Sequence, residues 1–278
     1  MARDPRAARL DDDPFAKIDD NQPVGKGTSQ HIRVVIQPGQ PNPFEPFLKG
    51  FFDVGGPRVV KHEGSFFHFS QRELKDLALS LVAFSLGLSF MFHGGVVRGM
   101  LGQGNALLVT IPLYFALAIV AFGPAFIIHE LAHKFVARHY GCWAEFRADP
   151  AGLRTGVLIA FFIGFLFMAP GAVMVAGNVN RRQNGMISLA GPASNLCMWL
   201  LGLPVLLLIP EGGVLGIAVY YWMVANAILG AFNMLPFGPL DGRKIKEWSG
   251  PVFWVFLTIF LGLVYLTILP GGQDLLLG

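Results

Sequence analysis

Residues 129–133 read HELAH, which places two histidines four positions apart with a glutamate between them. On an α-helix four residues turn through about 400°, so His129 and His133 lie about 40° apart on one face and about 6 Å apart along the axis. Both imidazoles can then reach one Zn²⁺ ion at about 2.0–2.1 Å. Glu130 lies to one side of the pair, where it can take a proton from a zinc-bound water. The spacing therefore predicts a hydrolytic zinc centre.

A catalytic zinc ion needs a third protein ligand, which leaves its fourth position open for water. His139 falls at the spacing of the longer pattern HExxHxxGxxH, but Val136 stands where that pattern has glycine. We therefore expect the helix to continue to about Gly141 and to carry His139 away from the pair. Glu145 and Asp149 follow in a predicted cytoplasmic loop, and nothing in the sequence singles them out.

The better candidate for the third ligand is Asp241, in the segment NMLPFGPLDG at residues 233–242. It follows an apolar stretch interrupted by two prolines, and Gly242 lets the backbone turn tightly. The charges of Zn²⁺, two neutral histidines, Asp241 and Glu130 sum to zero. A neutral cluster is far less costly in a low-dielectric site than bare carboxylates.

The elements that must bring these residues together are membrane spans. Of the 278 residues, 53% are hydrophobic and 14% are charged, and the mean hydropathy is +0.53, which is typical of a membrane protein. The net charge of +3 is small, so we expect no nucleic-acid partner. The two cysteines indicate neither a disulfide framework nor a cysteine metal site. Apolar stretches run over residues 77–92, 106–128, 157–177, 186–209, 214–235 and 251–269.

The orientation of these stretches follows from Lys and Arg, because positive charge marks the cytoplasmic side. Basic clusters follow the second and third stretches and precede the last, whereas the first loop carries only Arg98. If 157–177 crossed the membrane, Asp241 would lie on the opposite side from the histidines. If it dips in and returns, every cluster except Arg98 is cytoplasmic, and Pro170-Gly171 supports the dip because it breaks a helix.

We therefore predict an all-α polytopic membrane protein with about five transmembrane helices plus one re-entrant segment with short β-strand elements. Six full spans are the alternative. Residues 1–45 are polar and rich in Pro and Gly, which predicts a disordered cytoplasmic tail. Residues 46–73 alternate loosely around a glycine turn and predict a short β-like segment near the membrane. The membrane domain then covers residues 74–278.

Three segments together resemble the site-2 proteases, a family of intramembrane zinc metalloproteases. HELAH is similar to the family's HExxH, and NMLPFGPLDG to its NxxP…LDG motif, with Asp241 at the position of the third zinc ligand. GPASN, at residues 191–195, is similar to its GxxxN motif. The resemblance implies one Zn²⁺ ion held by His129, His133 and Asp241. It implies an endopeptidase, with Glu130 as the base, that cleaves transmembrane segments of single-span membrane proteins in the bilayer of the cell membrane, near the cytoplasmic face.

Further residues could serve the substrate side of the site. Asn195 would donate a hydrogen bond to the substrate carbonyl or to the developing oxyanion, a polar contact between helices being the alternative. Asn233 would support the turn that carries Asp241. GAVMVAG, at residues 171–177, is a candidate edge for pairing with an unwound substrate, although ordinary re-entrant packing is an alternative. A membrane zinc-binding or transport protein without proteolytic activity is the alternative function.

Overall fold

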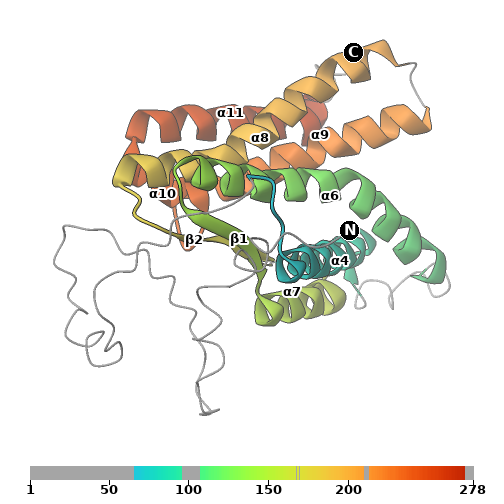
Figure 1. Ribbon diagram of the computed structural model, residues 1–278. Helices are drawn as coiled ribbons and strands as arrows, with labels where there is room; N and C mark the ends of the chain where they lie inside the picture. The colour runs from blue at the N-terminus through green and yellow to red at the C-terminus, as the bar shows by residue number, and fades with distance from the viewer. Residues whose placement is uncertain (1–65, 96–106, 167, 169, 210–212, 273–278) are drawn as a thin grey trace, which may run out of the picture.

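The computed structural model describes residues 66–95, 107–166, 168, 170–209 and 213–272. The predicted tail at 1–45 and most of the predicted β-like segment lie outside these described residues. The elements are α4 (Gln71–His93), α6 (Leu107–His139), β1 (Trp143–Ala148), α7 (Pro150–Ile163), β2 (Gly171–Ala176), α8 (Arg181–Leu208), α9 (Val214–Asn233), α10 (Asp241–Trp248) and α11 (Gly250–Ile268) (Figure 1).

Five of these helices are long and apolar enough to cross a membrane, namely α4, α6, α8, α9 and α11. This confirms the predicted fold class of a helical multi-pass protein with about five spans and short strands. Helix α4 begins three residues earlier than the predicted membrane domain, at Gln71, because the hydroxyl of Ser70 accepts a hydrogen bond from the backbone N–H of Glu73 at 3.1 Å and caps the helix. The last residues of the predicted β-like segment are therefore helical.

A small sheet lies where the sequence predicted a loop and part of a re-entrant segment. Strands β1 and β2 pair antiparallel, with Trp143 opposite Ala176 and Ala148 opposite Gly171. The chain between the two strands therefore leaves the sheet and returns to it. The sequence placed Glu145 in a loop after Gly141, and the structure instead forms strand β1 there, because a partner strand that follows the whole of α7 pairs with it.

The excursion between the strands differs in detail from the prediction. Helix α7 starts at Pro150, where Asp149 caps it by accepting a hydrogen bond from the N–H of Ala151. It ends at Gly164, which has φ 73° and closes the helix in the left-handed region, so the break comes before Pro170. The backbone of Gly164 lies against Gly94, at the C-terminal end of α4. Helix α7 thus reaches the far end of α4, and the chain then returns to the sheet.

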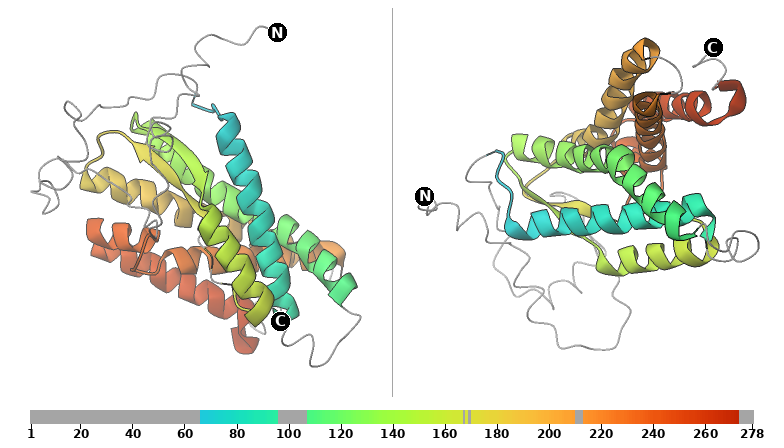
Figure 2. Two further views of the ribbon diagram at one scale, coloured as in Figure 1. Left: turned by 90° about the horizontal axis from the view of Figure 1, so that it is seen from below. Right: turned by 90° about the vertical axis from the view of Figure 1, so that its right-hand side faces the viewer.

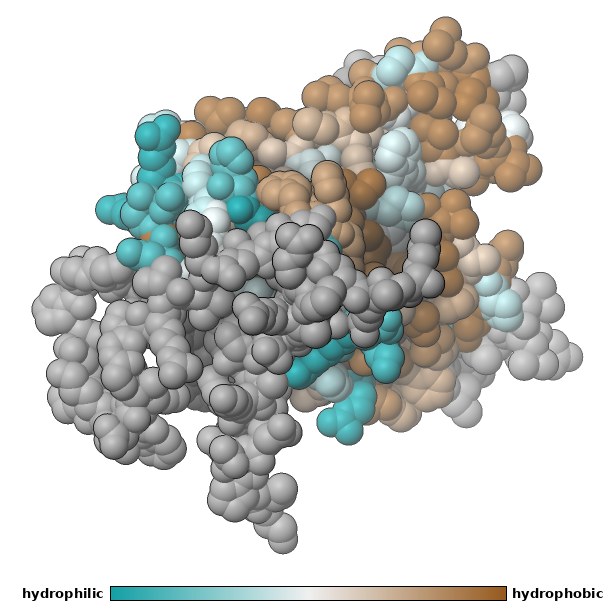
Figure 3. Space-filling model, in the orientation of Figure 1, coloured by the Kyte–Doolittle hydropathy of each residue, from teal (hydrophilic) through white to brown (hydrophobic). Residues whose placement is uncertain are grey.

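Helix α6 occupies the centre of the molecule, in contact with α4 on one side and with α8 and α9 on the other (Figures 1 and 2). It ends at His139, and Gly141 follows with φ 78°, which confirms the predicted stop. On the face seen in Figure 3, hydrophobic residues cover much of the visible surface of the long helices, and a group of hydrophilic residues lies near α10 and the start of α8. A surface of this kind fits helices that face lipid.

Candidate metal centre

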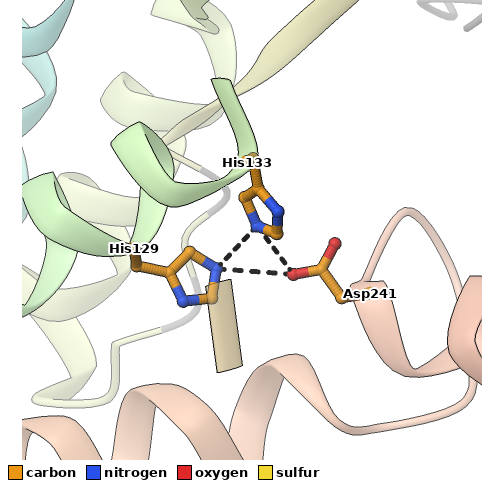
Figure 4. Close-up of side chains that lie close together, drawn as sticks. All are labelled: His129, His133 and Asp241. Carbon is orange, nitrogen blue, oxygen red and sulfur yellow. Dashed lines mark hydrogen bonds and ion pairs between the residues drawn. The ribbon is translucent and has the colours of Figure 1, made fainter. Parts of the chain in front are cut away.

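Three side chains from two helices converge at one point (Figure 4). His129 and His133 project from α6, and Asp241 is the first residue of α10. The Nε2 atoms of the two histidines lie 3.0 Å apart. The Oδ2 atom of Asp241 lies 3.4 Å from Nε2 of His129 and 3.0 Å from Nε2 of His133. All three residues are buried, and among the described residues they form the group that could hold a metal ion.

The donor set fits a tetrahedral zinc ion. Ligand atoms that each lie about 2.0–2.1 Å from zinc in tetrahedral geometry are about 3.3 Å from one another, close to the three separations seen here. The Nδ1 atom of His133 lies 2.7 Å from the carbonyl oxygen of Ile187, which can only accept, so Nδ1 carries the proton. Its Nε2 atom is then a lone-pair donor directed at a second imidazole nitrogen and a carboxylate. Such acceptors sit this close together when a cation lies between them.

Asn195 contacts His129 rather than the space that a substrate would occupy. Its Oδ1 atom lies 2.6 Å from Nδ1 of His129. Its Nδ2 atom donates to the carbonyl oxygen of Ala125 at 3.2 Å and to Oδ1 of Asn226 at 2.9 Å. Because both N–H groups of this fully buried amide are used, the structure gives Asn195 the role of orienting a metal ligand and does not support the predicted donation to a substrate.

Gly191 lets helix α8 approach the two imidazoles. A Cβ atom built at Gly191 would lie 2.5 Å from Nε2 of His129, and closer still to Nε2 of His133. Real carbon atoms do not come this close to such neighbours, so any larger residue would displace the rings. The surface that Gly191 leaves open therefore faces the imidazoles of His129 and His133.

Close packing around α10 holds Asp241 in place. A Cβ atom at Gly242 would collide with the carbonyl group of Met234, so the chain after α9 folds back tightly. Trp248, at the other end of α10, occupies the space that a side chain at Gly185 of α8 would need. Helix α10 is therefore fixed at both ends, against the segment after α9 and against α8.

Asp241 lies in α10, outside the five candidate spans. The groups around it determine its charge state. Burial acts to raise the pKa of this carboxyl group, but its contacts with the imidazoles of His133 and His129 and the nearby charge of Lys244 outweigh the burial. The pKa of Asp241 therefore lies well below its ordinary value. The group is ionised at neutral pH, which is the form that binds a cation.

The remaining predicted residues lie as follows. Glu130 follows His129 on α6 and is partly buried. The amide of Asn233 donates to the carbonyl oxygen of Leu229 at 3.0 Å, within its own helix, so this contact does not reach the Asp241 turn. His139 is exposed and outside the metal-binding group, in agreement with its rejection as a ligand.

The two acidic alternatives for the third ligand are engaged elsewhere. Glu145 accepts hydrogen bonds from Ser70 at 2.8 Å and from Arg147 at 2.7 Å. Asp149 caps α7. Of the acidic candidates considered from the sequence, Asp241 is the one that the structure brings to the histidines.

Sequence reasoning missed two groups that hold the imidazoles, one by a direct hydrogen bond and one through Asn195. The carbonyl of Ile187 has no signature in the sequence, because every residue carries one. Asn226 does have a signal, since it is an uncharged polar residue inside the apolar stretch 214–235 and is fully buried in α9. Polar side chains in such a stretch mark contacts between helices or functional sites.

Comparison with known proteins identifies several related chains. The chain is 35% identical over 194 residues to "Putative zinc metalloprotease MJ0611" of Methanocaldococcus jannaschii. The aligned region covers 69% of this chain and 92% of that protein. It is 29% identical over 190 residues to "Putative zinc metalloprotease YwhC" of Bacillus subtilis, which covers 55% of this chain and 85% of the relative. It is also 29% identical over 158 residues to "Putative zinc metalloprotease Rip3" of Mycobacterium tuberculosis, which covers 55% of this chain and 32% of that protein. No family profile and no solved structure matches the chain.

Proposed function

The chain belongs to the zinc metalloprotease family, and from this premise we propose that it is an intramembrane endopeptidase of the site-2 protease type. It cleaves transmembrane segments of single-span partner proteins near the cytoplasmic face of the cell membrane. The observation that carries the proposal is the meeting of His129, His133 and Asp241 at the ends of apolar helices. A hydrolytic centre at that place acts on peptide bonds within or close to the bilayer.

The residues of this centre have different roles. His129, His133 and Asp241 hold the zinc ion, and when bound it supplies Lewis-acid activation of water and of the scissile carbonyl. Glu130 takes the proton of the attacking water and then gives it to the leaving amine. Asn195 holds the imidazole of His129 in the orientation that keeps Nε2 directed at the metal.

A transmembrane substrate must be unwound locally, because a helix shields its own peptide bonds with hydrogen bonds. Strand β2 offers a template for the unwound segment. It pairs with β1 along one edge, and the sheet has two strands within the described part of the chain. Val173 and Val175 pack against the same hydrophobic cluster as Val136, a cluster that includes Ala137 of α6, and β2 contacts α6 directly. Addition of a substrate strand to β2 would bring its backbone to the side of the metal centre.

The cytoplasmic placement rests on charge. Arg181 and Arg182 begin α8, and Arg243 and Lys246 lie on α10, at the same ends of the helices as the metal centre. Positively charged residues of this kind flank transmembrane helices on the cytoplasmic side. In this orientation Asp241 and both histidines would lie at the inner face.

Replacement of Glu130 by glutamine tests the proposal. The purified protein in detergent is incubated with a panel of single-span membrane proteins, with and without a zinc chelator. Wild type is expected to cleave members of the panel, and the chelator is expected to abolish cleavage. Glu130→Gln is expected to keep zinc at wild-type stoichiometry and to lose cleavage, because glutamine cannot accept the proton.

The alternative function gives a different result in a parallel assay. A zinc-binding or transport protein would bind zinc through the same residues and leave the whole panel intact, and a transporter would in addition move zinc into proteoliposomes. Cleavage by Glu130→Gln at the wild-type rate would contradict the role of Glu130 as the base, even if the endopeptidase activity itself were observed.

A further inference from the structure

We propose that Asn226 is a positioning residue that acts through Asn195 to decide which nitrogen of His129 is free to bind zinc. The proposal rests on the zinc site described above and adds to it a residue from a third helix. Asn226 lies in α9, Asn195 in α8 and His129 in α6, and all three side chains are buried. They form one hydrogen-bonded chain, which we call the amide relay.

The distances along the amide relay are short and continuous. The Nδ2 atom of Asn226 lies 2.9 Å from the carbonyl oxygen of Trp222, one turn earlier in α9. Its Oδ1 atom lies 2.9 Å from Nδ2 of Asn195. Oδ1 of Asn195 in turn lies 2.6 Å from Nδ1 of His129. Each contact is within ordinary hydrogen-bond distance.

A backbone carbonyl sets the direction of the whole relay. The carbonyl of Trp222 can only accept, so the NH₂ group of Asn226 must face it and the oxygen of Asn226 must face Asn195. That oxygen can also only accept, so the NH₂ group of Asn195 faces Asn226 and the oxygen of Asn195 faces His129. Nδ1 of His129 must then carry the proton. Its Nε2 atom is left with the lone pair that a zinc ligand requires.

Asn226 is needed although Asn195 has a second acceptor. The carbonyl of Ala125 accepts the other N–H of Asn195 at 3.2 Å, a longer contact than that to Asn226. If Asn226 lost its oxygen, one N–H of Asn195 would be buried without a partner in the middle of the helix bundle, which is costly. The amide would then rotate to seek another acceptor, and its hold on His129 would weaken.

The test measures zinc binding and not proteolysis. The affinity of the full-length protein in detergent for Zn²⁺ is measured by competition with a chromogenic chelator, for wild type and for Asn226→Leu, which has a similar size and no acceptor. We expect Asn226→Leu to bind zinc about 10- to 100-fold more weakly, the usual effect of removing a group that orients a metal-bound histidine. In the Co²⁺-loaded protein, the visible d–d absorption is expected to change shape, because the ligand geometry changes.

Two further variants separate positioning from a general loss of stability. Thr267 of α11 is also fully buried and bonds the carbonyl of Leu263, one turn earlier in its own helix, at 2.7 Å. Thr267→Val removes that bond within α11, a helix that carries no member of the relay, and is expected to leave both the zinc affinity and the Co²⁺ spectrum unchanged. Asn226→Asp keeps an oxygen directed at Asn195 and is expected to bind zinc more tightly than Asn226→Leu.

The outcomes distinguish failure of the proposed role of Asn226 from failure of the zinc site. Wild-type zinc affinity and an unchanged Co²⁺ spectrum in Asn226→Leu would overturn the role of Asn226 and leave the zinc site standing. Equal losses of zinc affinity in Asn226→Leu and Thr267→Val would also overturn it, because the effect would then be structural. Absence of zinc binding by wild type would instead contradict the zinc site and the proposed function.

Discussion

The distance between α8 and the metal ligands is set at Gly191 by the absence of a side chain. The two Nε2 atoms face this glycine, while the two Nδ1 atoms are held by Asn195 and by the carbonyl of Ile187. The imidazoles are thus fixed from behind by hydrogen bonds and are given room in front by a missing Cβ. A zinc site needs both conditions, because its ligands must be oriented and must also reach the ion.

Gly191→Ala tests this arrangement at the scale of one methyl group. We expect the extra carbon to push both imidazoles apart, and overpacking of this kind costs about 1–3 kcal/mol. If that cost falls on the metal-bound state, the zinc affinity decreases by about 10- to 100-fold. The measurement is zinc content after dialysis against a series of buffered zinc concentrations.

Gly202→Ala is the matched control, since it makes the same change on the same helix. Its new Cβ would lie 2.7 Å from Cγ of Met223, a flexible side chain that can move aside. We expect this variant to keep its zinc with a small loss of thermal stability. Equal zinc contents in the two variants would show that Gly191 does not limit the approach to the imidazoles.

The residues of this site differ in how far the sequence reveals them. His129, Glu130 and His133 could be predicted because zinc chemistry demands their types and the helix fixes their spacing. Asp241 could be predicted once the span count placed it on the same side. Asn226 could not, because its partner in the relay is chosen by contact between two helices and not by any local pattern.

At the scale of elements, a buried charge cluster joins the start of α4, the end of α6 and strand β1. Lys134 donates to the carboxylate of Glu73, and both side chains are fully buried. Oε1 of Glu73 also accepts from the backbone N–H of Phe146 in β1, at 3.1 Å. Lys134 further donates to the carbonyl of His68 at 2.9 Å. Because Lys134 directly follows His133, the cluster connects the sheet to the helix that carries the metal ligands.

Glu73→Gln is expected to destabilise the protein by about 3–5 kcal/mol, because it leaves the ammonium of Lys134 buried without its charged partner. The double variant Glu73→Met/Lys134→Met removes both charges and is expected to recover much of that loss. The measurement is the free energy of unfolding in detergent for Glu73→Met, Lys134→Met and the double variant, arranged as a double-mutant cycle, with Glu73→Gln measured beside them.

The ion pair between Arg243 and Glu247 on α10 provides the control. Its side chains are 59% and 53% exposed, and the two residues are four apart on one helix. An exposed pair of this kind contributes about 0.3–0.5 kcal/mol, so Glu247→Gln should have little effect on stability. If Glu73→Gln were as mild as Glu247→Gln, the buried cluster would not be what holds the sheet to α6.

The elements also show which features of the fold can be predicted from the sequence. The long spans could be predicted, because a helix needs about 20 apolar residues to cross a bilayer and few other structures contain so long an apolar stretch. Strand β1 could not, because Glu145 and Arg147 alternate with apolar residues only briefly and the partner strand follows a helix. The end of α7 at Gly164 was misplaced because proline is the stronger breaker of a helix in sequence, whereas the left-handed glycine ends this one.

At the scale of the whole molecule, the site depends on how many times the chain crosses the membrane. The His129 and His133 end of α6 and the Asp241 end of α10 meet only if an even number of crossings separates them. Two candidate spans, α8 and α9, lie between them, and the excursion through α7 returns to the sheet from which it left. An odd number of crossings would put the third ligand on the opposite side of the membrane.

Cysteine labelling in cells can measure this parity. In a background with Cys142 and Cys197 replaced by alanine, single cysteines are introduced by His139→Cys, Asn178→Cys and Gly213→Cys. These three positions are exposed and lie at the end of α6, before α8 and before α9, respectively. A bacterial host expressing each variant is treated with a membrane-impermeant maleimide, before and after permeabilisation.

We expect His139→Cys and Asn178→Cys to be labelled only after permeabilisation, because the excursion through α7 begins and ends on the cytoplasmic side. Gly213→Cys, one full span later, is expected to be labelled in intact cells. If 157–177 crossed the membrane, Asn178→Cys and His139→Cys would react under opposite conditions. If all three patterns were inverted together, the parity would hold and the metal centre would face the outside, because the relative placement of the ligands does not depend on which leaflet they face.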